Sequence, residues 1–128
     1  MADRKRIVIL DDDDIFVALL TAVLAPSYDF VVGRNGREGL DLCRSGRVDL
    51  VVTDIGMPEL DGIQMLEEFQ KDKSLAAIPV LVTTASHFSR RSKSDVERFA
   101  QVRAVLCKPF NVDAIAEAIA KILKEPPR

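Results

Sequence analysis

Five aspartates of the chain lie directly beside short apolar runs, where a folded domain could gather them. Asp11 to Asp14 come immediately after the first run, and Asp54 ends another. Adjacent carboxylates repel one another, and capping of the next helix by Asp13 or Asp14 would account for only part of the group. If the fold brings Asp11, Asp12 and Asp54 together, a hard cation that prefers oxygen ligands would relieve the repulsion, and Mg²⁺ is the natural candidate.

Two further polar residues, Thr84 and Lys108, close other apolar runs. Each is ordinary alone, because threonine is common in strands and lysine usually extends into water. Together they would place a hydroxyl donor and a cation beside a carboxylate and a metal ion. This set suits a phosphoryl group on Asp54, because phosphoryl transfer depends mainly on positioning and on neutralising charge. Asp54 would itself be the nucleophile.

The apolar runs themselves predict a sheet. Four of them are apolar on both faces, and strands without alternation are typical of parallel sheets that helices cover on both sides. A weaker fifth strand is predicted at residues 28–32. Because ligands of such sheets bind beyond the carboxyl ends of the strands, the chemistry is expected there. The four runs are Ile7–Leu10, Leu50–Thr53, Val80–Thr83 and Ala104–Cys107.

Helical spacing of apolar residues fills the segments between the strands. The clearest helix is the last, for which Asn111 is the expected N-cap. Residues 94–97 form a capping box that would start the fourth helix near Asp95. Five strand-then-helix units imply right-handed crossovers and a doubly wound α/β domain over residues 1–124, with a frayed tail at 125–128. The helices are expected near residues 14–25, 36–46, 62–72, 95–102 and 111–124.

Composition excludes several classes of function. The formal net charge is only −2 over 128 residues, which predicts no basic face for nucleic acid. The longest apolar stretches are far too short to span a bilayer, and the basic N-terminus lacks the apolar segment of a signal peptide. The two cysteines, Cys43 and Cys107, are expected to be reduced thiols in the core. The cytoplasm is therefore the expected location.

Four segments of the sequence carry recognisable motifs in a fixed order. They are residues 9–12 (ILDD), 53–62 (TDIGMPELDG), 79–85 (PVLVTTA) and 108–110 (KPF). Together they resemble a bacterial response-regulator receiver domain, the phosphoacceptor domain of two-component phosphorelays, over roughly residues 5–124. The resemblance implies a flavodoxin-like fold, in which a five-stranded parallel sheet of strand order 2-1-3-4-5 carries helices on both faces.

The resemblance also implies roles for residues of the acidic group. Asp54 would be the phosphorylated residue, Asp12 would bind the metal ion directly, and Asp11 would act largely through water. The backbone carbonyl of Gly56 would be the third protein ligand of a Mg²⁺ or Mn²⁺ ion. The chain would not be a turnover enzyme, since it would catalyse the phosphorylation and dephosphorylation of its own Asp54.

Two more motif residues gain roles by the same resemblance. Thr84 and Lys108 would contact the phosphoryl oxygens, and the Lys108–Pro109 bond would be cis. The chain departs from the family pattern at Val105, where receivers often carry tyrosine or phenylalanine, and in a longer segment between Thr84 and Lys108. That segment is expected to be a solvated basic loop, and it holds His87, Arg90, Arg91 and Lys93.

The implied partners are a histidine kinase or histidine phosphotransfer protein as donor and a downstream protein that the sequence does not identify. The domain would be a monomer or weak dimer, and no output domain follows residue 124. Helical spacing places Ile15, Ala18 and Ala22 on one face of the first helix, where a donor would dock. The expected core stripe of that helix is Phe16, Leu19, Leu20 and Val23.

Three other functions remain open alternatives. Asp11 and Asp13 after a strand resemble the nucleophile motif of haloacid-dehalogenase-type phosphatases, although the further acidic pair that those enzymes need after Lys108 is lacking. A flavodoxin-like FMN binder would carry a Gly-, Ser- and Thr-rich phosphate loop where this chain has aspartates. A pseudo-receiver would keep the fold as a binding module without the chemistry. Metal and phosphodonor titration separates the three.

Overall fold

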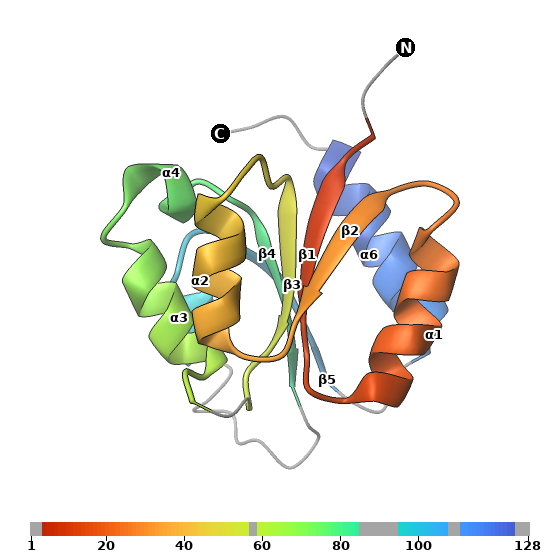
Figure 1. Ribbon diagram of the computed structural model, residues 1–128, viewed down its shortest axis with the longest axis horizontal. Helices are drawn as coiled ribbons and strands as arrows, with labels where there is room; N and C mark the ends of the chain where they lie inside the picture. The colour runs from red at the N-terminus through yellow and green to blue at the C-terminus, as the bar shows by residue number, and fades with distance from the viewer. Residues whose placement is uncertain (1–3, 57–58, 85–94, 108–110, 125–128) are drawn as a thin grey trace.

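The computed structural model describes residues 4–56, 59–84, 95–107 and 111–124. Its centre is one sheet of five parallel strands in the order β2-β1-β3-β4-β5 (Figure 1). This order confirms the doubly wound α/β fold that the sequence predicts. The strands are β1 (Arg6–Leu10), β2 (Asp29–Gly33), β3 (Leu50–Asp54), β4 (Val80–Thr84) and β5 (Val102–Cys107).

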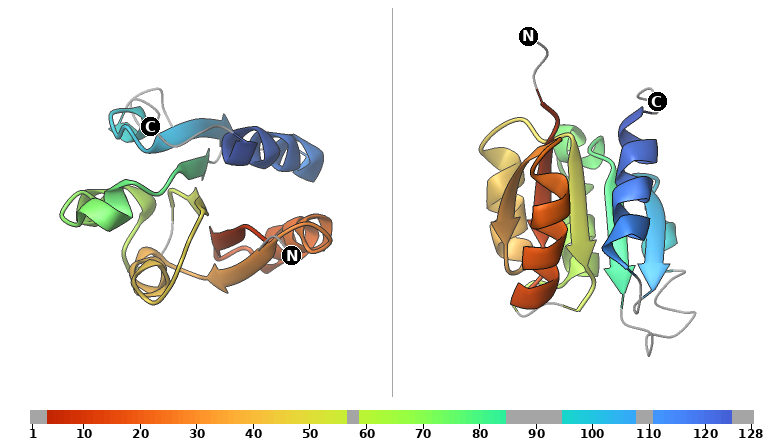
Figure 2. Two further views of the ribbon diagram at one scale, coloured as in Figure 1. Left: turned by 90° about the horizontal axis from the view of Figure 1, so that it is seen from above. Right: turned by 90° about the vertical axis from the view of Figure 1, so that its right-hand side faces the viewer.

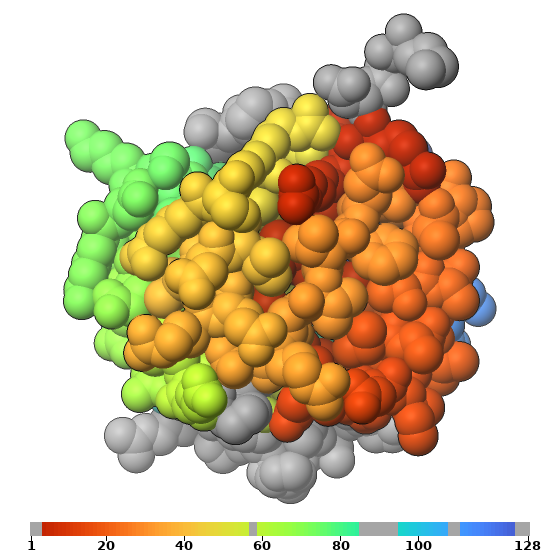
Figure 3. All heavy atoms as spheres, in the orientation of Figure 1, coloured from red at the N-terminus to blue at the C-terminus, as the bar shows by residue number. Residues whose placement is uncertain are grey.

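Helices cover both faces of the sheet, because its inner strands are apolar on both sides (Figure 2). One face carries α1 (Asp14–Leu24) and α6 (Val112–Lys124). The other carries α2 (Gly36–Arg44), α3 (Gly62–Phe69) and the short α4 (Lys73–Ala76). In the space-filling view of Figure 3, β2 lies between α1 and α2 on the side of the molecule that faces the viewer.

The last helix forms as its sequence predicts. The Asn111 side chain accepts a hydrogen bond of 2.8 Å from the backbone N–H of Ala114, which caps the first turn. Ile115, Ile119 and Ile122 form the buried stripe, and they pack against β1 and β3 through one of the two core clusters. The helix is therefore held by one amphipathic face, as most helices of globular proteins are.

Two of the predicted helices differ from the structure. The helix expected at 62–72 ends at Phe69, and Asp72 then caps the separate helix α4 by accepting from the Ser74 backbone N–H. The helix expected at 95–102 has only residues 95–97 helical, and β5 begins at Val102. The buried side chain of Gln101 accounts for this, because it donates to the carbonyls of Leu75 and Ile78 and so fixes the chain in a turn before β5.

The core face of α1 is rotated from the predicted stripe. Leu20 and Leu24 are buried, and Phe16 and Val17 pack partly against the same cluster. Leu19 and Val23 were expected in this core and are 55% and 38% exposed. The reason is that α1 packs against both α6 and β2, and this places the line through Leu20 and Leu24 inward. The prediction for Leu19 and Val23 was therefore wrong.

The two cysteines differ in their exposure to solvent. Cys43 is a buried thiol of α2, as expected, and burial raises its pKa to about 11. Cys107 ends the edge strand β5 and is exposed, so its expected place in the core was wrong. An edge strand has a neighbour on one side only, and at its last residue the side chain reaches solvent.

Candidate functional site

The register of the sheet brings the acidic residues to one edge. Leu10 of β1 pairs with Thr53 of β3, so the residues that follow them, Asp11 and Asp54, are neighbours at the carboxyl ends of the strands. One carboxylate oxygen from each of Asp11, Asp12 and Asp54 lies within 4.8 Å of the others. Asp11 is only 2% exposed, whereas Asp12 is open to solvent. The structure thus assembles the three aspartates as the sequence predicts.

The other aspartates of the run have separate roles. Asp13 is the N-cap of α1, where its carboxylate accepts from the backbone N–H groups of Ile15 (3.1 Å) and Phe16 (3.2 Å). Asp11 accepts from the backbone N–H of Asp13 at 2.9 Å, and its own N–H donates to Gly33 at 3.2 Å. These bonds help to orient Asp11 at the end of β1, where it joins the cluster.

Asp14, the fourth aspartate, pairs with a residue that the sequence analysis missed. The guanidinium of Arg34, directly after β2, lies 2.7 Å from the Asp14 carboxylate. The signal that could have found Arg34 is its position. Arg34 directly follows β2, and β2 ends at the same edge of the sheet as the strands that carry the other predicted site residues.

The loop after β3 is held by close backbone contacts. The backbone N–H of Gly56 donates to the Asp54 carboxylate at 3.3 Å, and the N–H of Gly36 donates to the carbonyl of Leu60 at 2.8 Å. A Cβ at Gly36 would lie 2.5 Å from that carbonyl oxygen, and one at Gly62 would lie 2.8 Å from the backbone oxygen of Asp54. Only glycine allows these approaches, so α2 and α3 fix the loop that follows the phosphoacceptor candidate.

Glu59 in the same loop has a strained backbone. Its φ of 63° lies in the left-handed region, which costs a residue with a Cβ about 1–2 kcal/mol. We expect Glu59→Gly to raise the free energy of unfolding by about 0.5–1 kcal/mol, after the larger entropy that glycine has in the unfolded chain is subtracted. Urea denaturation measures the change. Glu59→Ala is the matched control and should bring no such gain, since alanine has the same φ restriction; an equal gain from alanine would show that charge, not backbone strain, is responsible.

Of the remaining residues singled out in the sequence, some are described by the structure and others lie outside the described residues. Thr84 is 3% exposed at the end of β4, one residue beyond Thr83, the register partner of Asp54. Gly56 is an exposed loop residue next to Asp54. Lys108 and the Lys108–Pro109 bond lie outside the described residues, as do the basic residues at 87–93 and Ser94 of the capping box. Val105 is half-buried in β5 beside the core under α3.

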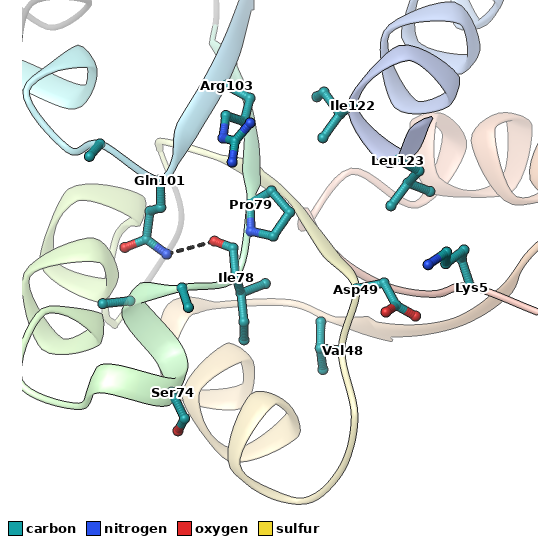
Figure 4. A pocket seen from close by; sticks show the side chains of 13 residues that line it. Lys5, Val48, Asp49, Ser74, Ile78, Pro79, Gln101, Arg103, Ile122 and Leu123 are labelled. Atoms are coloured by element: carbon teal, nitrogen blue, oxygen red, sulfur yellow. Dashed lines mark hydrogen bonds between the residues drawn. The ribbon is translucent and has the colours of Figure 1, made fainter. Parts of the chain in front are cut away.

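A separate hollow lies far from the acidic cluster. Its volume is about 560 Å³, and it opens at the amino ends of the strands, between the start of β4, β5 and the end of α6 (Figure 4). Pro79, Arg103 and Leu123 line it, and the Gln101 amide crosses one side to the Ile78 carbonyl. In sheets of this kind ligands bind at the opposite end, so the hollow is not the expected place for the chemistry.

The donor set fits a hard divalent cation. Three carboxylates converge so that one oxygen of each lies within 4.8 Å of the others, and the loop residue Gly56 follows Asp54 closely in the chain. Among the described residues the cluster offers carboxylate oxygens and neither histidine nor cysteine, and such ligands favour Mg²⁺-like ions over Zn²⁺ or copper. Fold and site together define a doubly wound α/β domain with an acidic cluster, able to hold a divalent cation, at the switch point between the paired strands β1 and β3.

The chain belongs to the response-regulator receiver domain family, whose model matches residues 7–120. It is 34% identical to the polar-differentiation response regulator DivK of Brucella anthropi, over 93% of this chain and 96% of that protein. Among solved structures, it is similar to the phosphorylated cyanobacterial phytochrome response regulator RcpA, with a TM-score of 0.80, 25% identity and coverage of 94% and 91%. CheY4 of Vibrio cholerae, a chemotaxis response regulator, shares the fold with a TM-score of 0.83 at 19% identity over 94% and 99% of the chains.

The family defines the general role of the domain. Receivers are the phosphoacceptor domains of two-component signalling, so the resemblance drawn from the four sequence motifs is confirmed. Across the residues that the structure describes, no helix is both long enough and apolar enough to cross a bilayer.

Proposed function

We propose that Asp54 accepts a phosphoryl group from a phosphohistidine of a histidine kinase or histidine phosphotransfer protein, and that this switches the binding of a downstream protein. The observation that carries the proposal is the convergence of Asp11, Asp12 and Asp54 within 4.8 Å at the switch point of the sheet. Asp54 is the member of the cluster that ends a strand and has its carboxylate oriented by the following loop, through Gly56.

The transfer is a simple displacement at phosphorus. A carboxylate oxygen of Asp54 forms a bond to phosphorus while the phosphorus–nitrogen bond to the donor imidazole breaks. The electron pair of that bond stays on the imidazole nitrogen, which is left neutral or takes up a proton. Dephosphorylation adds one water, releases inorganic phosphate and restores the carboxylate. Each chain is modified once and restored, so the domain acts as a self-modifying switch and not as a turnover enzyme.

A Mg²⁺ or Mn²⁺ ion held directly by the carboxylates of Asp12 and Asp54 and the carbonyl of Gly56 would neutralise negative charge on the transferring group. Asp11, oriented by its backbone hydrogen bonds, would act largely through water. The hydroxyl of Thr84 and the ammonium of Lys108 would contact the remaining phosphoryl oxygens. The buried position of Thr84 at the end of β4 supports its part in this set.

The proposed function is tested by mass spectrometry of the intact chain. Incubation with acetyl phosphate and Mg²⁺ should add one phosphoryl mass, and chelation of the metal with EDTA should prevent it. A chain that gains no mass at any Mg²⁺ concentration would contradict the phosphoacceptor role of this site.

The exposed face of α1 supports docking of the donor there. Ile15 is 75% exposed, and Leu19 and Val23 follow it at four-residue intervals, so three large apolar side chains form one exposed stripe. Ala18 and Ala22 are exposed beside them. The stripe begins at the end of α1 that carries the acidic cluster. A partner helix of a phosphotransfer bundle would cover it by packing along the helix.

Substitution of Ile15 separates docking from chemistry. Ile15→Glu should slow phosphorylation by the donor protein about tenfold or more, because the most exposed apolar contact of the stripe is replaced by a charge that the docked partner would bury. Labelling by acetyl phosphate should be unchanged, since no docking is needed. Rapid-quench kinetics with each donor measures both rates. Ala77→Glu, which adds the same charge at an exposed position away from α1, is the matched control. If both donors slow together on Ile15→Glu, the residue is structural.

The proposal also covers the cellular location and the oligomeric state of the chain. We place the chain in the cytoplasm, where histidine kinases present their phosphorylated domains, as a monomer or weak dimer. The downstream protein is defined only by its preference for one phosphorylation state. A pull-down with and without phosphodonor would identify it.

A further inference from the structure

The turn between β2 and α2 places a cation beside the acidic cluster. Leu10 of β1 pairs with Gly33 of β2, so Arg34 lies next to Asp11 along the same edge of the sheet. The turn is fixed by Asn35, which caps α2 by accepting from the backbone N–H of Glu38 at 2.9 Å. Arg34 therefore projects from a rigid point directly beside the strand ends that carry the carboxylates.

The guanidinium of Arg34 is directed to the acidic run. Its Nη1 lies 2.7 Å from the Asp14 carboxylate, and this hydrogen bond raises the pKa of Arg34, with a smaller contribution from the charge of Asp12. Arginine is protonated throughout the physiological pH range, so the positive charge is permanent. Because the sheet register also places Arg34 beside Asp11, one of the three residues of the cluster, its charge lies close to the cluster.

The ion pair is poorly suited to stabilising the fold. The side chains of Arg34 and Asp14 are 56% and 76% exposed, and exposed pairs of this kind contribute little to the free energy of unfolding. The main effect of a permanent positive charge here is on the electrostatic potential at the cluster, which it makes less negative for an incoming divalent cation. A double charge responds twice as strongly as a single one to the same potential.

We propose that Arg34 is a positioning residue that weakens and sets the affinity of the cluster for its divalent cation. It acts by holding Asp14 in an ion pair and by lowering the negative potential at the cluster. The inference rests on the proposed function in one respect, that the cluster binds Mg²⁺. Removal of the positive charge should tighten Mg²⁺ binding, and addition of a negative charge should tighten it further.

A charge series at position 34 tests this. Isothermal titration calorimetry of the full chain with MgCl₂ measures the dissociation constant without any phosphodonor. Arg34→Lys should match the wild type, Arg34→Gln should bind Mg²⁺ about two- to fivefold more tightly, and Arg34→Glu more tightly again. The differences should shrink as the salt concentration rises. If Arg34 had only a structural role, all three variants would bind Mg²⁺ more weakly than the wild type, whatever the charge at position 34. That result would overturn the proposal.

Three further variants complete the design. Asp14→Asn should weaken Mg²⁺ binding by a similar factor, because it removes a negative charge and releases Arg34 toward the cluster. The double variant, Arg34→Gln with Asp14→Asn, should bind Mg²⁺ with an affinity close to that of the wild type. Lys71→Gln is the matched control, since Lys71 forms a solvent-accessible pair with Glu68 at 2.8 Å, at the carboxyl end of α3, and should leave Mg²⁺ binding unchanged. Equal affinities of Arg34→Gln and wild type overturn this inference alone, whereas a wild type that binds no Mg²⁺ overturns the proposed function.

Discussion

Asp54→Asn is expected to abolish phosphorylation of the chain completely. The amide has no charged oxygen to attack phosphorus, so the nucleophile is lost while the shape of the side chain is kept. Asp54 is only part-buried at the end of β3, and its carboxylate accepts one hydrogen bond from Gly56, which an amide oxygen can also accept. The fold should therefore survive, and the loss should be at least a hundredfold in the rate of mass gain with acetyl phosphate, about the limit of detection.

The control for this experiment is an aspartate outside the cluster. Asp41 is exposed on α2, and Asp41→Asn makes the same chemical change with the same effect on net charge. It should label at the wild-type rate. Circular dichroism should show both variants folded. Equal labelling of Asp54→Asn and wild type would show that another residue accepts the phosphoryl group.

Asp12→Ala should raise the Mg²⁺ concentration needed for half-maximal labelling by at least about tenfold. Loss of an outer-shell partner of a metal typically costs 10–100-fold in affinity, and a direct carboxylate ligand should cost no less. Titration of the labelling rate against MgCl₂ measures the shift, and at saturating Mg²⁺ much of the rate should return. The variant should fold, because Asp12 is exposed and no hydrogen bond of the cap of α1 depends on it.

The same substitution has a second expected effect in the absence of metal. Removal of one of three carboxylates that converge within 4.8 Å relieves repulsion, so the metal-free variant should be no less stable than the metal-free wild type. Mg²⁺ should then stabilise the wild type against urea more than it stabilises Asp12→Ala. A normal Mg²⁺ requirement in Asp12→Ala would remove Asp12 from the ligand set.

The strands and the acidic site could be predicted because both depend on local patterns. Runs that are apolar on both faces predict a parallel sheet, and parallel strands share one edge for their carboxyl ends. Asp11 and Asp54 then had to become neighbours once β1 and β3 paired. The capping roles of Asp13 and Asn111 were also visible, since capping depends on residues within one turn of the helix.

What could not be predicted depended on contacts between distant segments. The inward face of α1 is decided by α6 and β2, and the α1 sequence is apolar on more than one face, so Leu19 and Val23 looked as suitable for the core as Leu20. The early start of β5 depends on Gln101, whose partners lie more than twenty residues away. Arg34 gains its significance only through its contact with Asp14. The roles of Lys108 and of its bond to Pro109 remain predictions.

The unequal exposure of the two cysteines gives the domain a built-in attachment point for a reporter. The chain has no tryptophan, so its intrinsic fluorescence offers little signal for the switch. Cys107 is exposed and pairs in register with Thr84, at the carboxyl edge where the chemistry is proposed, whereas the thiol of Cys43 is buried with its pKa raised to about 11. A maleimide fluorophore can therefore be attached to the wild-type protein at one place, without removing a native cysteine. Its emission would follow occupancy of the neighbouring site in real time.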